Sequence, residues 1–154
     1  MGLVHAAESV VLDARPEDIY TILVDYRNEH ARILPPQYFT HLTVEEGGAG
    51  AGTVFRTQVR VMGQTRDFHM AVSEPELGRV LRETDLDTGL ATTFTLTPVD
   101  NGQRTRLEIR SEWQNKGGLS GWLDSLTTPS VMRRIYRSQF QQMAQYLKTR
   151  TRQV

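Results

Sequence analysis

Cysteine is absent from this 154-residue chain. Its absence excludes disulfides, thiol nucleophiles and thiolate metal sites, and it leaves no redox evidence for a compartment. No apolar run is long enough to cross a bilayer. Net charge is also lacking, because 18 Lys and Arg residues match 18 Asp and Glu residues. The chain therefore lacks the positive field that drives binding to nucleic acid or anionic lipid, and we expect neither partner.

We also expect no secretory signal. The first residues contain no basic segment and reach Glu8 before an apolar core can form. We expect a cytoplasmic protein without stable membrane insertion. The length fits one domain spanning 1–154, and a fold of this size buries roughly 68 to 70% of the surface that its unfolded chain exposes.

Alternation of apolar and polar residues with a period of two dominates the chain. It begins at Val4–Leu12 and returns after Tyr38 in six further segments. These segments span 38–46, 53–61, 64–75, 79–85, 90–99 and 103–114. Short turns join them, including a glycine-rich turn at 47–52. Short strands joined by short turns predict an antiparallel meander.

Helical signals stand on either side of the six strands. Pro16, with Glu17 and Asp18, favours a helix start after the first strand, and a second short helix is expected between Asp25 and Pro35. After 115–118 the period becomes helical, with a break at Thr128-Pro129 and a long segment to about Arg150. Its apolar stripe consists of Met132, Ile135, Tyr136, Phe140, Met143 and Leu147.

Turn and packing residues carry a family resemblance over nearly the whole chain. They are Asp13-Ala14-Arg15-Pro16-Glu17-Asp18-Ile19-Tyr20, Asp25 ahead of Pro35, Gly50-Ala51-Gly52-Thr53, Glu74-Pro75 with Gly78-Arg79, and Gly102 with Thr105-Arg106-Leu107. With this order of elements, the chain resembles the START-like helix-grip (SRPBCC) superfamily and is most similar to its bacterial polyketide cyclase/dehydratase-like single-domain members. The resemblance implies an α+β fold in which a curved antiparallel seven-stranded sheet wraps around a long C-terminal helix.

An internal cavity is expected between such a sheet and one helix, because the two cannot pack tightly along their whole length. Candidate ligand-binding residues on the inner faces are Arg27, Phe55, Thr57, Val59, Phe68, Met70, Phe94, Ser111, Trp113, Tyr136, Phe140 and Met143. Each of the apolar residues can equally be plain core. A closed chamber below about 300 Å³ would argue against storage or transport of a ligand.

Catalytic candidates are few. Glu8 shares a strand face with Val10 and Leu12, so it either faces the cavity as an acid or base or meets water or an arginine. Tyr26 and His30 fall near the expected entrance with Arg27, which can bind a carboxylate or remain in solvent. His69 is expected to point away from the inner face.

Metal and cofactor chemistry have no support in the sequence, because the four histidines lie in separate elements without ligand spacing. The leading hypothesis is binding of a lipid, polyketide or aromatic compound in the cavity. An enzyme resembling the polyketide cyclases or dehydratases is one alternative, and a protein-interaction module is another. The arginines of the last helix read as a solvated face, and the oligomeric state stays open.

Overall fold

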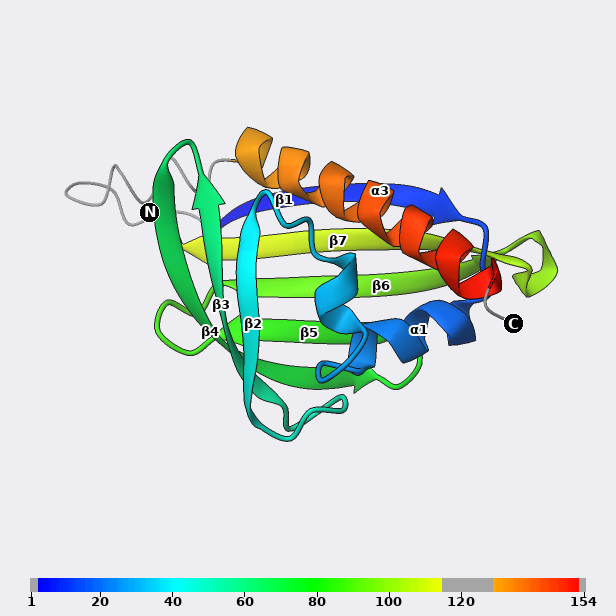
Figure 1. Ribbon diagram of the computed structural model, residues 1–154, viewed down its shortest axis with the longest axis horizontal. Coiled ribbons are helices and arrows are strands. Elements are labelled where there is room, and N and C mark those ends of the chain that lie inside the picture. Colours follow the sequence, from blue (N-terminus) through cyan, green and yellow to red (C-terminus); the bar gives the residue numbers. More distant parts are fainter. Residues whose placement is uncertain (1–2, 115–128, 153–154) are drawn as a thin grey trace.

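The computed structural model describes residues 3–114 and 129–152. Its elements follow the predicted order, with one sheet and a long C-terminal helix (Figure 1). The strands are β1 (Leu3–Leu12), β2 (Phe39–Glu46), β3 (Val54–Val61), β4 (Gln64–Glu76), β5 (Val80–Asp85), β6 (Ala91–Val99) and β7 (Arg104–Gln114). The helices are α1 (Pro16–Val24), α3 (Pro129–Arg152) and the short 3₁₀ turns η1 (His30–Ile33) and η2 (Asp100–Gly102). The predicted helical start at 119–126 lies outside the described residues.

All seven strands form one antiparallel sheet in the order β1-β7-β6-β5-β4-β3-β2. Strands β2 to β7 make the predicted meander, and β1 closes the far side by pairing with β7 from Leu3 opposite Gln114 to Leu12 opposite Thr105. The sheet curls, and α3 crosses its concave side (Figure 1). This arrangement confirms the α+β helix-grip fold.

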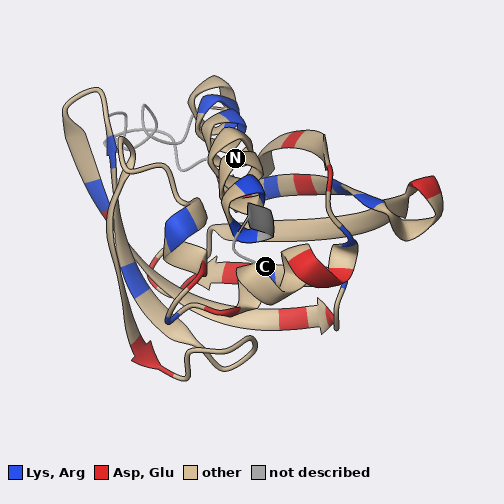
Figure 2. Cartoon of the chain, turned by 45° about the vertical axis from the view of Figure 1, so that its right-hand side comes forward, with Lys and Arg blue, Asp and Glu red and all other residues tan. Residues whose placement is uncertain are grey.

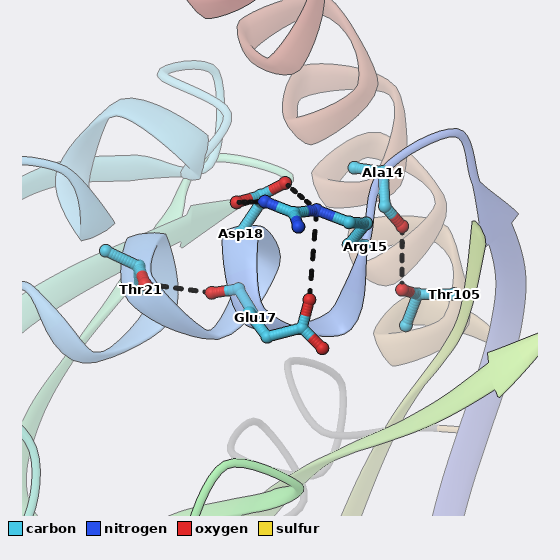
Figure 3. A network of polar contacts seen from close by, with 6 residues as sticks. All are labelled: Ala14, Arg15, Glu17, Asp18, Thr21 and Thr105. Carbon is cyan, nitrogen blue, oxygen red and sulfur yellow. Dashed lines mark hydrogen bonds and ion pairs between the residues drawn. The ribbon is translucent and has the colours of Figure 1, made fainter. Parts of the chain in front are cut away.

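Helix α1 is fixed to the sheet at its first turn (Figure 3). The Thr105 hydroxyl on β7 donates a hydrogen bond of 2.8 Å to the Ala14 carbonyl, just before the helix begins. Arg15 pairs with Asp18 at 3.1 Å and with Glu17 at 3.8 Å, where the two acids also favour the positive end of the helix dipole. The predicted start at Pro16 is therefore confirmed.

The second short helix is shorter than predicted. Tyr26 and Arg27 lie in a turn before η1 because the backbone leaves the helical path at Asp25, which forms an isolated antiparallel bridge with Ala49. The Tyr26 amide donates to the Gly48 carbonyl at 2.9 Å and to the Val24 carbonyl at 3.1 Å, so it does not continue the α-helical pattern of α1. The glycine-rich loop thus competes with the helix for backbone hydrogen bonds.

Gly48 is required at this contact. Its φ is +135°, and a Cβ there would lie 2.3 Å from Arg27 Nε. Arg27 packs across the loop and donates to the Gly47 carbonyl. The glycine-rich segment therefore accommodates the Arg27 side chain.

Helix α3 turns its predicted apolar stripe toward the sheet. Ile135, Tyr136, Phe140 and Met143 are buried, and burying one large apolar side chain contributes roughly 1.5 to 3 kcal/mol. The C-terminal half of α3 also holds the segment before β2, since Arg150 Nε lies 3.0 Å from the Glu29 carboxylate. Lys and Arg positions recur along α3, whereas basic and acidic positions are interspersed on the sheet (Figure 2). Within the described ranges, no helix is long and apolar enough to cross a membrane.

Candidate functional site

A partly open cavity lies between the concave face of the sheet and α3. Side chains from five strands, η1, the β5–β6 turn and α3 line it. The lining residues are His30, Leu34, Phe39, Phe55, Thr57, Val59, Arg66, Phe68, Met70, Glu83, Leu90, Thr92, Phe94, Met132, Ile135, Tyr136 and Gln139. Most of them are apolar, so the cavity favours a ligand with an apolar body.

The cavity volume is about 80 Å³. One water needs about 10 to 15 Å³ of such space, so the cavity has room for roughly five to eight waters. It is smaller than the roughly 300 to 1,000 Å³ of sites for drug-sized ligands. The volume therefore suits a compact molecule and argues against enclosure of a long acyl chain.

Polar side chains cross the apolar wall in one strip. Glu83 on β5 is paired in register with Thr92 on β6, which is paired in turn with Ser111 on β7. The Thr92 and Ser111 hydroxyls are 2.6 Å apart, and the Tyr136 hydroxyl from α3 donates to Ser111. The strip therefore joins the sheet to the helix across the cavity.

Glu83 forms the buried end of this strip. Its side chain is 9% exposed, and its Oε2 accepts a hydrogen bond of 2.6 Å from the Tyr26 hydroxyl. His30 Nε2 lies 3.4 Å from the same oxygen, and His30 Nδ1 lies 2.7 Å from the Leu23 carbonyl oxygen. Both His30 and Glu83 line the cavity, whereas Tyr26 lies behind them. A carboxyl, an imidazole and a phenol thus meet at one wall.

Aromatic rings hold the imidazole in place. The Tyr26 ring stacks on the His30 ring at a centroid distance of 4.3 Å, and Phe94 meets His30 edge-on at 6.1 Å. The Phe55 ring also stacks on the Tyr26 ring, at a centroid distance of 5.0 Å. Because a buried aromatic group of this kind has little freedom to rotate, the nitrogen facing Glu83 is fixed in direction.

Burial sets the ionisation of this cluster. Removal from water raises the pKa of the Glu83 carboxyl, and His30 together with the Tyr26 hydrogen bond opposes part of that rise. Burial also raises the pKa of the Tyr26 phenol, and the neighbouring Glu83 charge raises it further. Tyr26 is therefore a neutral donor at ordinary pH.

The cation at the cavity is Arg66 rather than the predicted Arg27. Arg66 lies on β4, and its guanidinium carbon is 5.1 Å from the centre of the Phe68 ring. Arg27 is engaged with the glycine-rich loop and does not line the cavity. Alternation along β4 could have identified Arg66, since it lies two residues before Phe68 on the same face.

Seven of the predicted ligand-binding residues line the cavity together: Phe55, Thr57, Val59, Phe68, Met70, Phe94 and Tyr136. Among the rest, Ser111 lies behind Thr92 and Tyr136, while Phe140 and Met143 are buried in the core beside α3. Trp113 is partly buried and packs against the same core. These four and Arg27 are therefore core or supporting residues in this structure.

The three catalytic candidates separate. Glu8 lies at the edge between β1 and α3, where its Oε1 is 3.4 Å from Arg137 Nη1 and 4.0 Å from Arg133 Nε. This contact confirms the alternative in which Glu8 meets an arginine. His30 lines the cavity and Tyr26 supports it through Glu83. His69 points away from the cavity to Glu45 on β2, with Nε2 2.8 Å from Oε1.

Sequence reasoning missed Glu83. The strand carrying it was predicted, and the alternation of Leu81, Glu83 and Asp85 places all three on its buried side. A glutamate in phase with a buried leucine is an informative signal, because an unpaired carboxylate facing apolar surroundings is costly. The signal was available in the pattern of β5, but its partners Tyr26 and His30 are 57 and 53 positions away.

No group of three or more His, Asp or Glu residues is placed to hold a metal ion among the described residues. The buried Asp85 has a structural role, since its Oδ2 accepts a 2.6 Å hydrogen bond from the Thr88 hydroxyl and so closes the β5–β6 turn.

Comparison with known proteins agrees with this architecture. A family model described as polyketide cyclase / dehydrase and lipid transport matches residues 4–148. No curated protein matches the sequence.

Solved structures are similar over nearly the whole chain. The KanY protein (ms6282) is 25% identical, with a TM-score of 0.81 over 96% of this chain and 99% of that chain. A START superfamily protein from Mycobacterium smegmatis is 16% identical, with a TM-score of 0.73 over 96% and 99%. The Zhui aromatase/cyclase from Streptomyces sp. R1128 is 18% identical, with a TM-score of 0.76 over 97% and 96%. The latter two likenesses show the fold alone.

Proposed function

The chain belongs to the polyketide cyclase / dehydrase and lipid transport family, and from this premise we propose that its cavity binds a compact, largely apolar molecule of one or two rings. The observation that carries the proposal is the apolar wall interrupted by one buried polar strip. Such a wall provides apolar contact for rings and a small number of groups that orient an oxygen.

Cavity size supports a ring compound over a lipid, the two kinds of ligand suggested by the family description. A cavity of about 80 Å³ has room for roughly five to eight waters. Enclosing a long acyl chain needs a larger and more elongated cavity. Phe55, Phe68 and Phe94 contribute flat apolar surfaces that suit ring contacts. A ring-based compound is therefore favoured over a long-chain lipid.

Polar groups at the wall favour a ligand that carries oxygen. Thr92 offers a hydroxyl, Arg66 a guanidinium, and Glu83 a carboxyl at separate points of the lining. A hydrocarbon would make no hydrogen bond to these groups and would gain only apolar burial. A phenol or ketone satisfies at least one of them, so it should bind more tightly than the hydrocarbon of equal size.

Titration with 2-naphthol, naphthalene and palmitate, followed by two-dimensional NMR, tests this proposal. We expect saturable binding of 2-naphthol with shifts at Phe94 and Thr92, weaker binding of naphthalene, and no enclosed binding of palmitate. Val59→Phe fills the cavity wall and should weaken 2-naphthol binding by about tenfold or more. Val11→Phe, at a 39% exposed position on β1, is the matched control that should leave binding unchanged. Equal binding by the Val59→Phe variant would contradict the proposed site.

A second candidate function is acid–base catalysis on the bound molecule. The buried contact between Glu83 and His30 favours it, because carboxyl and imidazole groups are among those that most often transfer protons in enzymes. Both functions use the same cavity. They differ in whether the bound molecule is released unchanged or is chemically converted.

A further inference from the structure

We propose that Glu83 and His30 are a proton-transferring pair that enolises a ketone held in the cavity. This inference rests on the proposed function, because it needs a ligand seated against the polar wall. Three features of the structure support it: the number of protons that the pair can hold, its position at the cavity, and the rigidity of its surroundings.

Hydrogen-bond geometry fixes the proton count. His30 Nδ1 faces the Leu23 carbonyl at 2.7 Å, and a carbonyl only accepts, so Nδ1 carries a hydrogen. Nε2 then faces Glu83 Oε2 at 3.4 Å. Two bare acceptors in that position would repel each other, and two protons would leave a buried net positive charge. The pair therefore holds one proton between them and is neutral overall.

Position makes this proton available to a ligand. Among the described residues, both partners of the Glu83 carboxyl, Tyr26 and His30, are at Oε2, and Glu83 lines the cavity. Oε1 is thus the oxygen left for a bound molecule. Thr92, the register partner of Glu83, lines the cavity beside it. Since Tyr136 donates to Ser111, Ser111 can donate to Thr92, which leaves the Thr92 hydrogen for a ligand oxygen.

Rigidity keeps the pair in this arrangement. The His30 ring lies between the stacked Tyr26 ring and the edge-on Phe94 ring, and its Nδ1 is tied to the backbone. Tyr26 is a positioning residue, because it bonds Glu83 from behind and does not line the cavity. Catalytic groups held in this way lose little time in unproductive orientations.

The reacting form of the pair has the shared proton on His30 Nε2, which leaves Glu83 as the carboxylate. Glu83 then takes a proton from the carbon next to a ketone carbonyl. The C–H electron pair becomes the C=C bond, and the carbonyl π pair moves to oxygen, where Thr92 donates a hydrogen bond. His30, carrying the shared proton on Nε2, is the adjacent cation that offsets the developing negative charge. The reverse step returns a proton from Glu83 to carbon, so no oxidant, reductant or further reactant is consumed.

Deuterium exchange tests the step directly. The probe is 2-tetralone, a two-ring ketone, incubated with the protein in D₂O while ¹H NMR follows loss of the hydrogens next to the carbonyl. We expect exchange above the buffer rate, inhibition by 2-naphthol, and a loss of roughly 10²- to 10⁴-fold in Glu83→Gln. Glu83→Gln keeps an oxygen that accepts from Tyr26, so binding of 2-tetralone should persist.

Two further variants keep the test decisive. Glu8→Gln makes the same chemical change outside the cavity and should exchange like the wild type. His30→Gln keeps a donor for the Leu23 carbonyl while removing the imidazole, and it should also lose exchange, which covers the case in which Glu83→Gln does not fold. Binding of 2-tetralone without exchange in the wild type would overturn this inference and leave the proposed function standing. Exchange in Glu83→Gln at the wild-type rate would overturn it as well, whereas absence of binding would remove both.

Discussion

Two glutamates on the same sheet show how strongly surroundings decide what a carboxyl can do. Glu83 on β5 is 9% exposed at its side chain and meets a phenol and an imidazole inside the cavity wall. Glu8 on β1 is 25% exposed and meets two arginines at the outer edge of α3. Solvent screens the contacts of Glu8, whereas those of Glu83 are made in a medium of low dielectric.

The comparison separates stability from chemistry. An ion pair near the surface adds about 0 to 1 kcal/mol to stability. A buried carboxyl is costly to ionise, and this cost is what makes its protonation state responsive to a partner or a ligand. Of the two glutamates, Glu83 therefore has the environment in which a carboxyl can act as an acid or a base.

Removal of the Glu83 side chain should have the largest effect. Glu83→Ala leaves the Tyr26 hydroxyl and the His30 imidazole without their partner in a buried site, which costs about 3 to 5 kcal/mol of unfolding free energy. Urea denaturation followed by circular dichroism measures this loss. A loss below 1 kcal/mol, the range expected for an exposed carboxyl, would show that the cluster is not buried as described.

Loss of the Tyr26 hydroxyl alone should have an intermediate effect. Tyr26→Phe keeps the stacked ring and removes the donor to Glu83 Oε2, so the free energy of unfolding should fall by about 1 to 3 kcal/mol. The same denaturation experiment measures it, with Tyr38→Phe at a partly buried position before β2 as the control. Equal stability of wild type and Tyr26→Phe would contradict the hydrogen bond.

The dependence of stability on pH should distinguish wild type from Glu83→Gln. Because the folded pKa of Glu83 is raised above its ordinary value of 4.5, its contribution is fully present below pH 4.5 and is lost as pH rises through the folded pKa. Glu83→Gln cannot ionise and lacks this loss. The difference in unfolding free energy should therefore shift in favour of Glu83→Gln as pH rises above 4.5, and two parallel curves would contradict the raised pKa.

The smallest effect should come from Glu8. Glu8→Gln removes a contact with Arg137 whose side chain is 59% exposed, so stability should change by about 0 to 1 kcal/mol. The change should shrink further in 1 M salt, because salt screens exposed pairs. A loss as large as that of Glu83→Ala would remove the contrast between the two glutamates.

Local patterns predicted much of the fold. Alternation and turn residues located all seven strands to within about two residues, and the stripe on α3 was confirmed. The short helix before Pro35 was confirmed as η1, but its start was wrong, because Tyr26 lies in a turn held by a distant hydrogen bond to Gly48. A local helical pattern cannot predict a hydrogen bond to a loop residue 22 positions later in the sequence.

The candidate site was predicted less well than the fold, for a related reason. Inner-face apolar residues such as Phe55, Phe68 and Phe94 follow from strand period, and the structure brings them together. Glu83 becomes informative only beside Tyr26 and His30, which come from a turn and from η1. Polar sites are formed by convergence of separate elements, which no single periodicity encodes.

The most direct measurement is ¹³C NMR of the side-chain carboxyls in protein labelled at glutamate, recorded while 2-tetralone is added. The account predicts that the Glu83 carboxyl signal moves with saturation of the cavity while the Glu8 signal stays in place. A response at Glu8 with none at Glu83 would contradict the central claim that the buried carboxyl of β5 is the one that meets the ligand.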